Sequence, residues 1–188
     1  MSTNEKSQSE SNQDSAGTGL PNTTTRSALL INESDQTFRQ MVQNLVALCG
    51  RIDQVRNRFA KRLGISGPQY NVLLFVAQNQ GREGITVSKV ADGLLVTGAY
   101  VTKEVNQLIV RGLITKTPNP EDGRSVLLRL SEHGSQSLAA LAPALQTVND
   151  EMFGSLDQDR FLAISGTVHQ LLMDAEKTAR KVSFYLDD

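Results

Sequence analysis

Apolar residues first recur at helical spacing from about residue 36. Intervals of three and four separate eight of them, which predicts one long amphipathic helix over 36–63, ended near Gly64: Phe38, Val42, Leu45, Cys49, Ile52, Val55, Phe59 and Leu63. Ser66-Gly-Pro-Gln69 has the pattern of a capping box with proline in the first turn. It predicts a second helix that runs through VLLFVAQ and stops at Gly81.

Two shorter helices and a hairpin follow. Thr86 and Thr97 are predicted N-caps of a third helix and of a fourth helix from Gly98 to Arg111. The prolines and Gly123 of PNPEDGRSVLLRL interrupt any helix, so we expect a strand at 113–117, a tip at 118–124 and a strand at 125–130. Helix, tight connection, helix and hairpin make a winged helix-turn-helix, over about 66–130.

Long helices flank this module on both sides. A fifth is predicted to begin near Ser131 and a sixth at Ser155-x-x-Gln158, so that 36–63 and 131–182 form the flanking helices and 183–188 a C-terminal tail. Their apolar stripes exceed what one small module can cover, which predicts burial against a second copy of the chain. The expected fold is mainly α with a small β-hairpin wing.

The N-terminal segment 1–35 is predicted to be a disordered polar tail. Residues 1–27 consist largely of Ser, Asn, Thr, Gln and Gly and cannot offset the entropy of ordering. The apolar residues 28–31 either dock an arm or begin the fold.

Charge is uneven although the net charge of the 188 residues is only −1. Residues 37–63 carry net +5 and residues 97–130 net +2, whereas residues 131–188 carry net −5. One cysteine, no secretory signal and no apolar run near the length of a membrane span lead us to expect a cytoplasmic protein without membrane association.

The fourth helix has two faces. Val101, Val105 and Leu108 cluster on one side, and the other is polar but mixed, with the following members: Ala99, Tyr100, Thr102, Lys103, Asn106 and Gln107. Amides and a lysine can donate to base edges in a DNA major groove, while the Thr97 hydroxyl and first-turn amides suit a phosphate. The alternative interpretation is an ordinary solvated helix face.

The hairpin tip carries charges close together. Asp122 and Arg124 can pair across it, so that Arg124 reaches a minor groove while Lys116 and Ser125 contact the DNA backbone. The alternative is a solvated turn whose surface ion pair contributes about 0–1 kcal/mol.

Several segments together resemble the MarR family of regulators. DGRSVLLRLSEHG resembles its wing signature, ITVSKVADGLLVTGAYVTKEVNQLIVRGLITK its helix-turn-helix and entry to the wing, and GISGPQYNVL its second-helix start. The resemblance covers about residues 36–182. It implies a homodimer that binds a pseudo-palindromic operator, usually as a repressor, and that a small ligand often releases. The alternative is a winged-helix DNA-binding or protein-interaction module that responds to no ligand.

The remaining chemistry is sparse. No nucleophile with an orienting base, paired carboxylates or phosphate loop is found, and the two histidines have no second ligand at helical spacing, so we expect no enzyme activity, metal or cofactor. The family's peroxide-sensing position falls on Val42, and Cys49 lies in the apolar stripe, which favours a buried structural cysteine. For an organic effector, such as an aromatic acid or an acyl-CoA, the expected lining residues are Arg51, Tyr70 and Phe75; their alternative interpretation is a surface arginine and two core aromatics.

Overall fold

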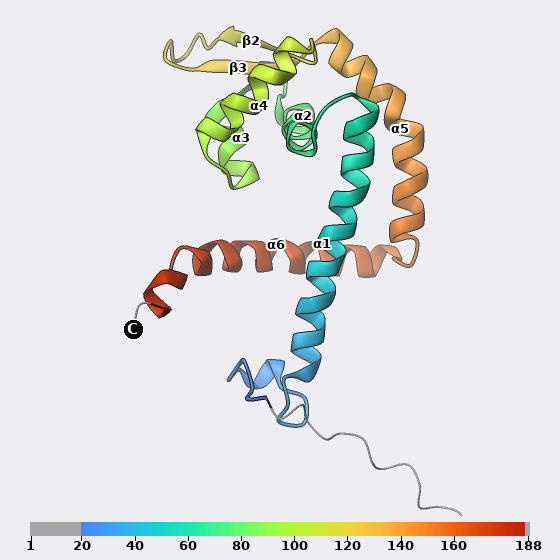
Figure 1. The fold of residues 1–188 in the computed structure, drawn as a ribbon, viewed down its shortest axis with the longest axis vertical. Helices are drawn as coiled ribbons and strands as arrows, with labels where there is room; N and C mark the ends of the chain where they lie inside the picture. The colour runs from blue at the N-terminus through green and yellow to red at the C-terminus, as the bar shows by residue number, and fades with distance from the viewer. Residues whose placement is uncertain (1–19, 187–188) are drawn as a thin grey trace, which may run out of the picture. The chain divides into compact units, whose positions relative to one another are not determined.

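The computed structural model describes residues 20–186 (Figure 1). They form two compact units, divided between Leu74 and Phe75. The first unit contains a short 3-10 helix η1 (Ser27–Leu29), the long helix α1 (Gln36–Arg62) and the start of α2 (Gly67–Asn79). The capping box of α2 is present: the Gln69 side chain accepts from Ser66 N at 3.0 Å, and Ser66 Oγ accepts from Gln69 N at 3.3 Å.

The second unit contains the predicted helix-turn-helix, α3 (Val87–Leu94) and α4 (Gly98–Val110). Thr86 and Thr97 cap these helices through their side-chain oxygens, as predicted. Leu95 ends α3 in the left-handed region, with φ of 55°. Gly93 lies against the ring of Phe75, where any side chain would collide with the aromatic carbons. The positive φ of the tight connection falls on Leu95 and not on this glycine.

The wing is part of a three-stranded antiparallel sheet in the order β1-β3-β2, formed by β1 (Ile85–Thr86), β2 (Ile114–Pro118) and β3 (Val126–Leu130). The hairpin matches the predicted one within a residue at its ends, but the pattern did not predict β1, which pairs Ile85 with Leu128. The core of this unit includes Val90, Val101, Leu108, Ile114 and Leu128, all of which are buried.

Two long helices follow the wing, α5 (Glu132–Phe153) and α6 (Gln158–Ala179), and the chain continues into a 3-10 helix η2 (Val182–Tyr185). Ser131 caps α5 as predicted. The predicted cap of α6 was wrong, because Asp157 rather than Ser155 accepts the hydrogen bond, from Arg160 N at 2.8 Å. A carboxylate two residues later suits the positive end of the helix dipole at least as well as a serine.

Three further expectations need correction. Residues 1–19 lie outside the described residues, but residues 20–35 are not a structureless tail, since they contain η1 and an antiparallel bridge between Ile31 and Ser34. Part of the predicted C-terminal tail forms η2. Cys49 was predicted to be buried, but it is exposed in the single chain because the surrounding half of α1 is uncovered.

Candidate nucleic-acid interface

Helix α4 buries its predicted apolar side and exposes its predicted polar side. Val101, Val105 and Leu108 are buried. Seven residues expected at DNA are all exposed: Thr97, Ala99, Tyr100, Thr102, Lys103, Asn106 and Gln107. The helix therefore presents small, amide, hydroxyl and lysine groups to solvent on one side, as a helix in a major groove requires.

Two of the hydroxyl groups on α4 are already held by the helix. Thr97 Oγ1 accepts from Tyr100 N at 3.2 Å, and Thr102 Oγ1 donates to the Gly98 carbonyl at 2.8 Å. Each oxygen keeps hydrogen-bonding capacity for a phosphate or a base, because a hydroxyl has one donor and two acceptor sites. These bonds reduce the number of positions that the two side chains can take before they meet a ligand.

Glu104 is a functional candidate that the sequence pattern missed. It is only 6% exposed, although the adjacent Lys103 is exposed. Its carboxylate lies 3.9 Å from the Lys103 ammonium, and after desolvation it is the second cause that raises the pKa of the Tyr100 hydroxyl. Periodicity indicates only which side of a helix is buried, so a carboxylate at the edge of that side gives no signal in the sequence.

The tip of the wing is a network of hydrogen bonds. Asn119 N donates to the Ser125 carbonyl at 3.1 Å, and Asn119 Nδ2 donates to Ser125 Oγ at 2.9 Å. Asp122 Oδ1 accepts from the backbone amide of Arg124 at 3.0 Å. The tip is therefore ordered by side chains that bond to nearby backbone groups, as in Asx turns.

This network corrects the predicted pairing of Asp122 with the Arg124 side chain. Among residues 20–186, no ion pair joins the two side chains, and the carboxylate holds the arginine through its backbone amide instead. Arg124 and Lys116 are exposed. Ser125 Oγ donates to the Asp122 carbonyl at 3.1 Å, so its hydroxyl belongs to the turn as well.

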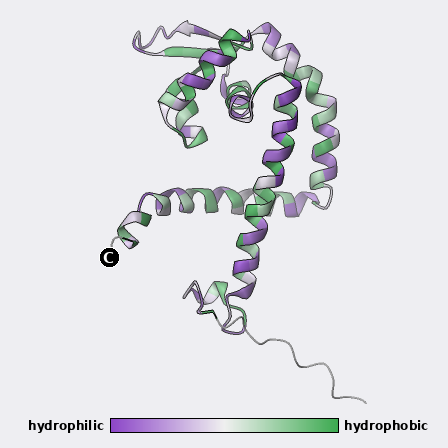
Figure 2. Ribbon diagram, in the orientation of Figure 1, coloured by the Kyte–Doolittle hydropathy of each residue, from purple (hydrophilic) through white to green (hydrophobic). Residues whose placement is uncertain are grey.

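The recognition helix and the wing belong to the same packed unit. Helix α4 packs against β2, and the sheet joins the wing to β1 at the start of α3 (Figure 1). In Figure 2 the strand β3 is apolar and the wing tip is hydrophilic, which matches a strand that packs on the core and a tip that extends into solvent. One packed unit thus carries both groups of candidate DNA contacts.

Residues 63–125 match the sequence model of the MarR family. This region, which contains α3, α4 and β2, is of the MarR type. Its curated relatives include the HTH-type transcriptional repressor IacR of Pseudomonas putida, 29% identical over 109 residues that cover 58% of this chain and 61% of that protein. The organic hydroperoxide resistance transcriptional regulator of Bacillus subtilis is 35% identical over 74 residues, which cover 39% and 48%. The chain thus spans about half to three fifths of the length of these two relatives.

Solved MarR-family structures have the same fold. AbsC of Streptomyces coelicolor superposes with a TM-score of 0.66 at 12% identity and covers 76% of this chain and 96% of its own. A MarR variant from E. coli complexed with operator DNA gives a TM-score of 0.59 at 21% identity and covers 71% and 94%. The predicted family and the predicted fold class, mainly α with a small wing, are confirmed.

The expected effector residues lie in different surroundings. Arg51 is exposed and donates to Gln54 on its own helix at 2.9 Å, whereas Tyr70 is buried. The hydroxyl of Tyr70 has no hydrogen-bond partner among the described residues, and desolvation raises its pKa against the opposing charge of Arg56. Phe75 is half-buried and packs on Gly93.

A small pocket of about 220 Å³ lies beside Arg56, between α1 and α2, and is lined by Asp53, Arg56, Asn57, Gly67, Pro68 and Asn71. Arg56 Nε donates to Asn71 Oδ1 at 2.8 Å. A guanidinium and an unpartnered phenol can both donate to a carboxylate. Arg56 was not predicted from the sequence, because helical spacing does not show which of several arginines faces a neighbouring helix.

Within residues 20–186, no helix combines the length and apolar character that crossing a membrane requires. The same residues contain no group of three or more His, Cys, Asp or Glu side chains arranged to hold a metal ion.

Proposed function

We propose that the protein is a sequence-specific DNA-binding transcriptional regulator that acts as a homodimer, in the cytoplasm, as a repressor of a pseudo-palindromic operator. The observation that carries this proposal is the exposed face of α4, which joins a lysine and two amides to small residues beside an ordered wing. A protein-interaction module has no need of that combination. The relatives' names, a repressor and a hydroperoxide-resistance regulator, support the same function class and make an enzyme activity unexpected.

The proposed dimer is supported by long uncharged stretches in the two C-terminal helices. Residues 135–149 of α5 and 161–173 of α6 contain no Asp, Glu, Lys or Arg. On α6 the exposed large apolar residues are Phe161, Leu162, Ile164, Val168, Leu171 and Leu172, and green residues recur along this helix in Figure 2. Exposed apolar surface of this extent typically marks an interface. A second copy of the chain can cover the apolar surface of both helices.

Binding to DNA of known and random sequence tests the main proposal. Selection of DNA from a random pool should yield one inverted-repeat sequence, bound at least ~10³-fold more tightly than random DNA at one fixed salt concentration. Equal affinity for all sequences would leave only a non-specific DNA-binding protein. No DNA binding at low salt would support the protein-interaction module.

We propose further that a small organic anion releases the protein from DNA, with Tyr70 and Arg56 as its polar contacts. The lining residues predicted from the sequence are Arg51, Tyr70 and Phe75. The support is Arg56, which lines the pocket, together with the buried, unpartnered hydroxyl of Tyr70, whose pKa is raised by desolvation against the opposing charge of Arg56. A thermal-shift screen with aromatic acids and acyl-CoA thioesters, repeated with operator DNA, tests it. An effector should raise the melting temperature of the free protein and weaken its DNA complex.

The wing gives a prediction about Asp122 and Arg124. Arg124→Ala should weaken operator binding by about tenfold or more, because a groove or phosphate contact is lost. Asp122→Ala should also weaken it, since the freed tip must be ordered on association, at about 0.5–1.5 kcal/mol per long side chain. Asp122→Asn keeps an oxygen for the Arg124 amide and removes a negative charge near DNA, so it should bind as tightly as the parent or more tightly.

Operator titrations of these variants at one salt concentration measure the effects. If Asp122→Ala binds more tightly than the parent, or if its effect is additive with that of Arg124→Ala, the tip is only a solvated turn. An unchanged oligomeric state in all variants is the control, because the wing lies outside the flanking helices.

A peroxide response is a second candidate, favoured by one relative's name and by the exposure of Cys49 in the single chain. We nevertheless expect Cys49→Ser to leave DNA release by organic hydroperoxide unchanged, because the family's sensing position is occupied here by Val42. A gel-shift titration with peroxide measures this. Release of the parent from DNA, together with retention of the serine variant, would establish Cys49 as a sensor.

A further inference from the structure

The root of the wing is the end of β3 that lies farthest from the tip, Arg129 and Leu130. Strand β3 pairs with β2 over five residues but with β1 over only two, at Leu127 and Leu128. On the β1 side, no residue of the described part of the chain continues the ladder to the root. An isolated two-stranded hairpin is only marginally stable, so other contacts at the root are needed to hold the wing in one direction.

The side chain of Gln80, just after α2, occupies the place that a longer β1 would fill. Successive amides along a strand point to opposite edges, and Ser131 N donates to the Leu113 carbonyl on the β2 side at 3.1 Å. Leu130 N points to the other edge and donates to Gln80 Oε1 at 2.8 Å. Gln80 and Leu130 are both half-buried. The bond thus satisfies a backbone amide that the short β1 leaves unpaired.

The loop 80–84 lies directly on the same part of β3. Gly84 N donates to the Gln80 carbonyl at 2.7 Å, which closes the loop into a compact turn. Gly84 has a φ of 108°, and a Cβ at this position would lie 3.0 Å from the Leu128 carbonyl oxygen. Glycine is the residue that adopts this conformation and permits so close an approach. The backbone of the loop is therefore packed against the strand.

A second side chain joins the strand to the loop in the opposite direction. Arg129 is half-buried on β3, and its guanidinium donates to the backbone carbonyl of Arg82. Among residues 20–186, no carboxylate lies within ion-pair distance of Arg129. Its contact is with the backbone of the loop, so it does not depend on the exposed side chain of Arg82. We call the two bonds, Leu130 to Gln80 and Arg129 to Arg82, the root contact.

The direction of the root matters because the tip of the wing is distant from it. The five residues of β3 span about 17 Å at ~3.3 Å per residue. A rotation of about 10° at the root therefore moves the tip by about 3 Å, which is the length of a hydrogen bond. Arg124 is exposed at the tip and is the wing residue expected in a groove of DNA. A small change of direction is enough to remove it from that contact.

We propose that Gln80 and Arg129 are positioning residues for the wing. Through the root contact they hold β3 on the loop 80–84 and thereby fix the direction in which Arg124 meets DNA. The inference rests on the proposed DNA binding and adds to it two residues that act through the wing. A residue that only stabilises the fold would affect binding whether or not Arg124 is present, and this difference makes the two roles separable.

Operator titrations at one fixed salt concentration test the role of Gln80. Gln80→Met keeps the length of the side chain and removes the acceptor, so the wing must be ordered on association and binding should weaken by about fivefold or more. Gln80→Glu keeps an acceptor for Leu130 N and adds a charge. Gln78→Glu adds the same charge at an exposed position two residues away, so the two glutamate variants should bind operator within about twofold of each other.

Arg129 has its own matched control. Arg129→Met removes a guanidinium together with its bond to the loop. Arg82→Met also removes a guanidinium, but it keeps the carbonyl that accepts from Arg129. Arg129→Met should therefore weaken operator binding by about fivefold more than Arg82→Met does. Equal losses would mean that only the charge matters at both positions, and they would overturn the role of Arg129.

The central measurement repeats Gln80→Met in an Arg124→Ala background. Most of the loss that Gln80→Met causes should disappear there, because the wing has lost the side chain that its direction presents. An equal loss in both backgrounds would show a general effect on stability and overturn the inference.

The outcomes also separate the inference from the proposed function. If Arg124→Ala weakens operator binding while Gln80→Met binds as the parent does, the inference fails and the proposed DNA binding stands. If Arg124→Ala has no effect, the proposed wing contact fails and the inference fails with it. A parent protein that selects no DNA sequence overturns the proposed function itself, and with it the inference.

Discussion

Leu171→Asp should convert the dimer into a monomer at micromolar concentration. Leu171 is 44% exposed in the single chain and lies in the uncharged segment 161–173 of α6. A carboxylate there would lose water on dimerisation without gaining a partner, which costs several kcal/mol. The substitution occurs twice in a symmetric interface, so a weakening of about a thousandfold or more is expected, at 1.4 kcal/mol for each factor of ten.

Light scattering over a dilution series measures this effect. Gln170→Asp is the matched control, because it adds the same charge one residue away. Gln170 lies on the side of α6 opposite its apolar face, so this variant should leave the dimer intact. The fold of the monomeric variant can be checked by its helical circular dichroism. A parent protein that is monodisperse at 20.5 kDa, or a Leu171→Asp variant that stays dimeric, would contradict the proposed interface.

Lys103→Ala and Asn106→Ala should each reduce the preference for operator over random DNA. Both side chains are exposed on α4, on the side opposite the buried Val101 and Leu108. A side chain that bonds a base edge contributes about 1–3 kcal/mol of discrimination, so each variant should lose about tenfold or more of its specificity ratio. The Glu104 carboxylate lies 3.9 Å from the Lys103 ammonium, which remains largely exposed to solvent.

Lys116→Ala is the control that separates base contacts from phosphate contacts. Lys116 is exposed on β2, where we expect it to meet the DNA backbone. Its removal should weaken binding to operator and random DNA alike. The slope of log binding constant against log salt concentration should become shallower by about one. If Lys103→Ala behaves in the same way as Lys116→Ala, α4 contacts only phosphates, and the proposed reading face is wrong.

Local chemistry made much of the fold predictable from the chain. Thr86, Thr97 and Ser131 were identified as helix caps because the preference for a side-chain acceptor depends only on the nearest backbone amides. The helical spacing of its apolar residues likewise predicted which side of α4 is buried. The prolines and Gly123 located the tip of the wing, since both residue types act on their own backbone dihedrals.

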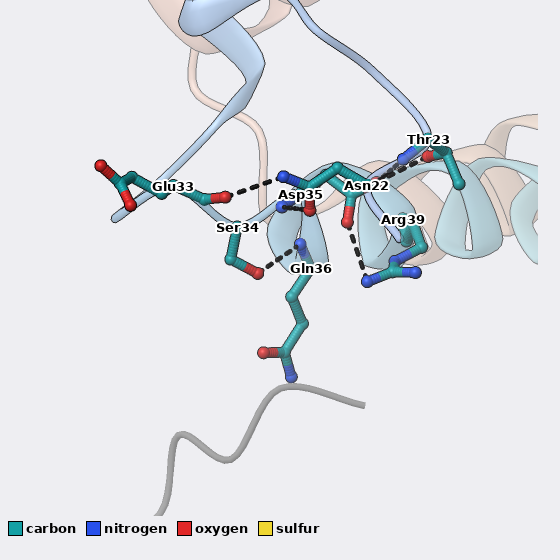
Figure 3. A network of polar contacts seen from close by, with 7 residues as sticks. All are labelled: Asn22, Thr23, Glu33, Ser34, Asp35, Gln36 and Arg39. Carbon is teal, nitrogen blue, oxygen red and sulfur yellow. Dashed lines mark hydrogen bonds and ion pairs between the residues drawn. The ribbon is translucent and has the colours of Figure 1, made fainter. Parts of the chain in front are cut away.

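The errors occurred where partners are distant in sequence or where two local solutions compete. Strand β1 is two residues long and exists only because β3 pairs with it, so no pattern of its own could reveal it. The Asp122 carboxylate could bind either the guanidinium or the backbone amide of Arg124. It accepts from the backbone amide, because the tight turn places that amide within reach. The sequence predicts a tail at residues 20–35 because their order depends on hydrogen bonds between Thr23 and Asp35, which no local pattern indicates (Figure 3).

By itself, therefore, the sequence determined the helices with their caps, the wing and the family, all of which depend on contacts within a few residues or on the pattern of a whole segment. Contacts between distant segments fix which polar side chains are buried and which stay exposed. They account for the burial of Glu104 and Asp35, the exposure of Arg124 and the proximity of Arg56 to Tyr70. The physical reason is that desolvation and hydrogen bonding act through space, so a polar residue gains its role from neighbours that the chain's order does not specify.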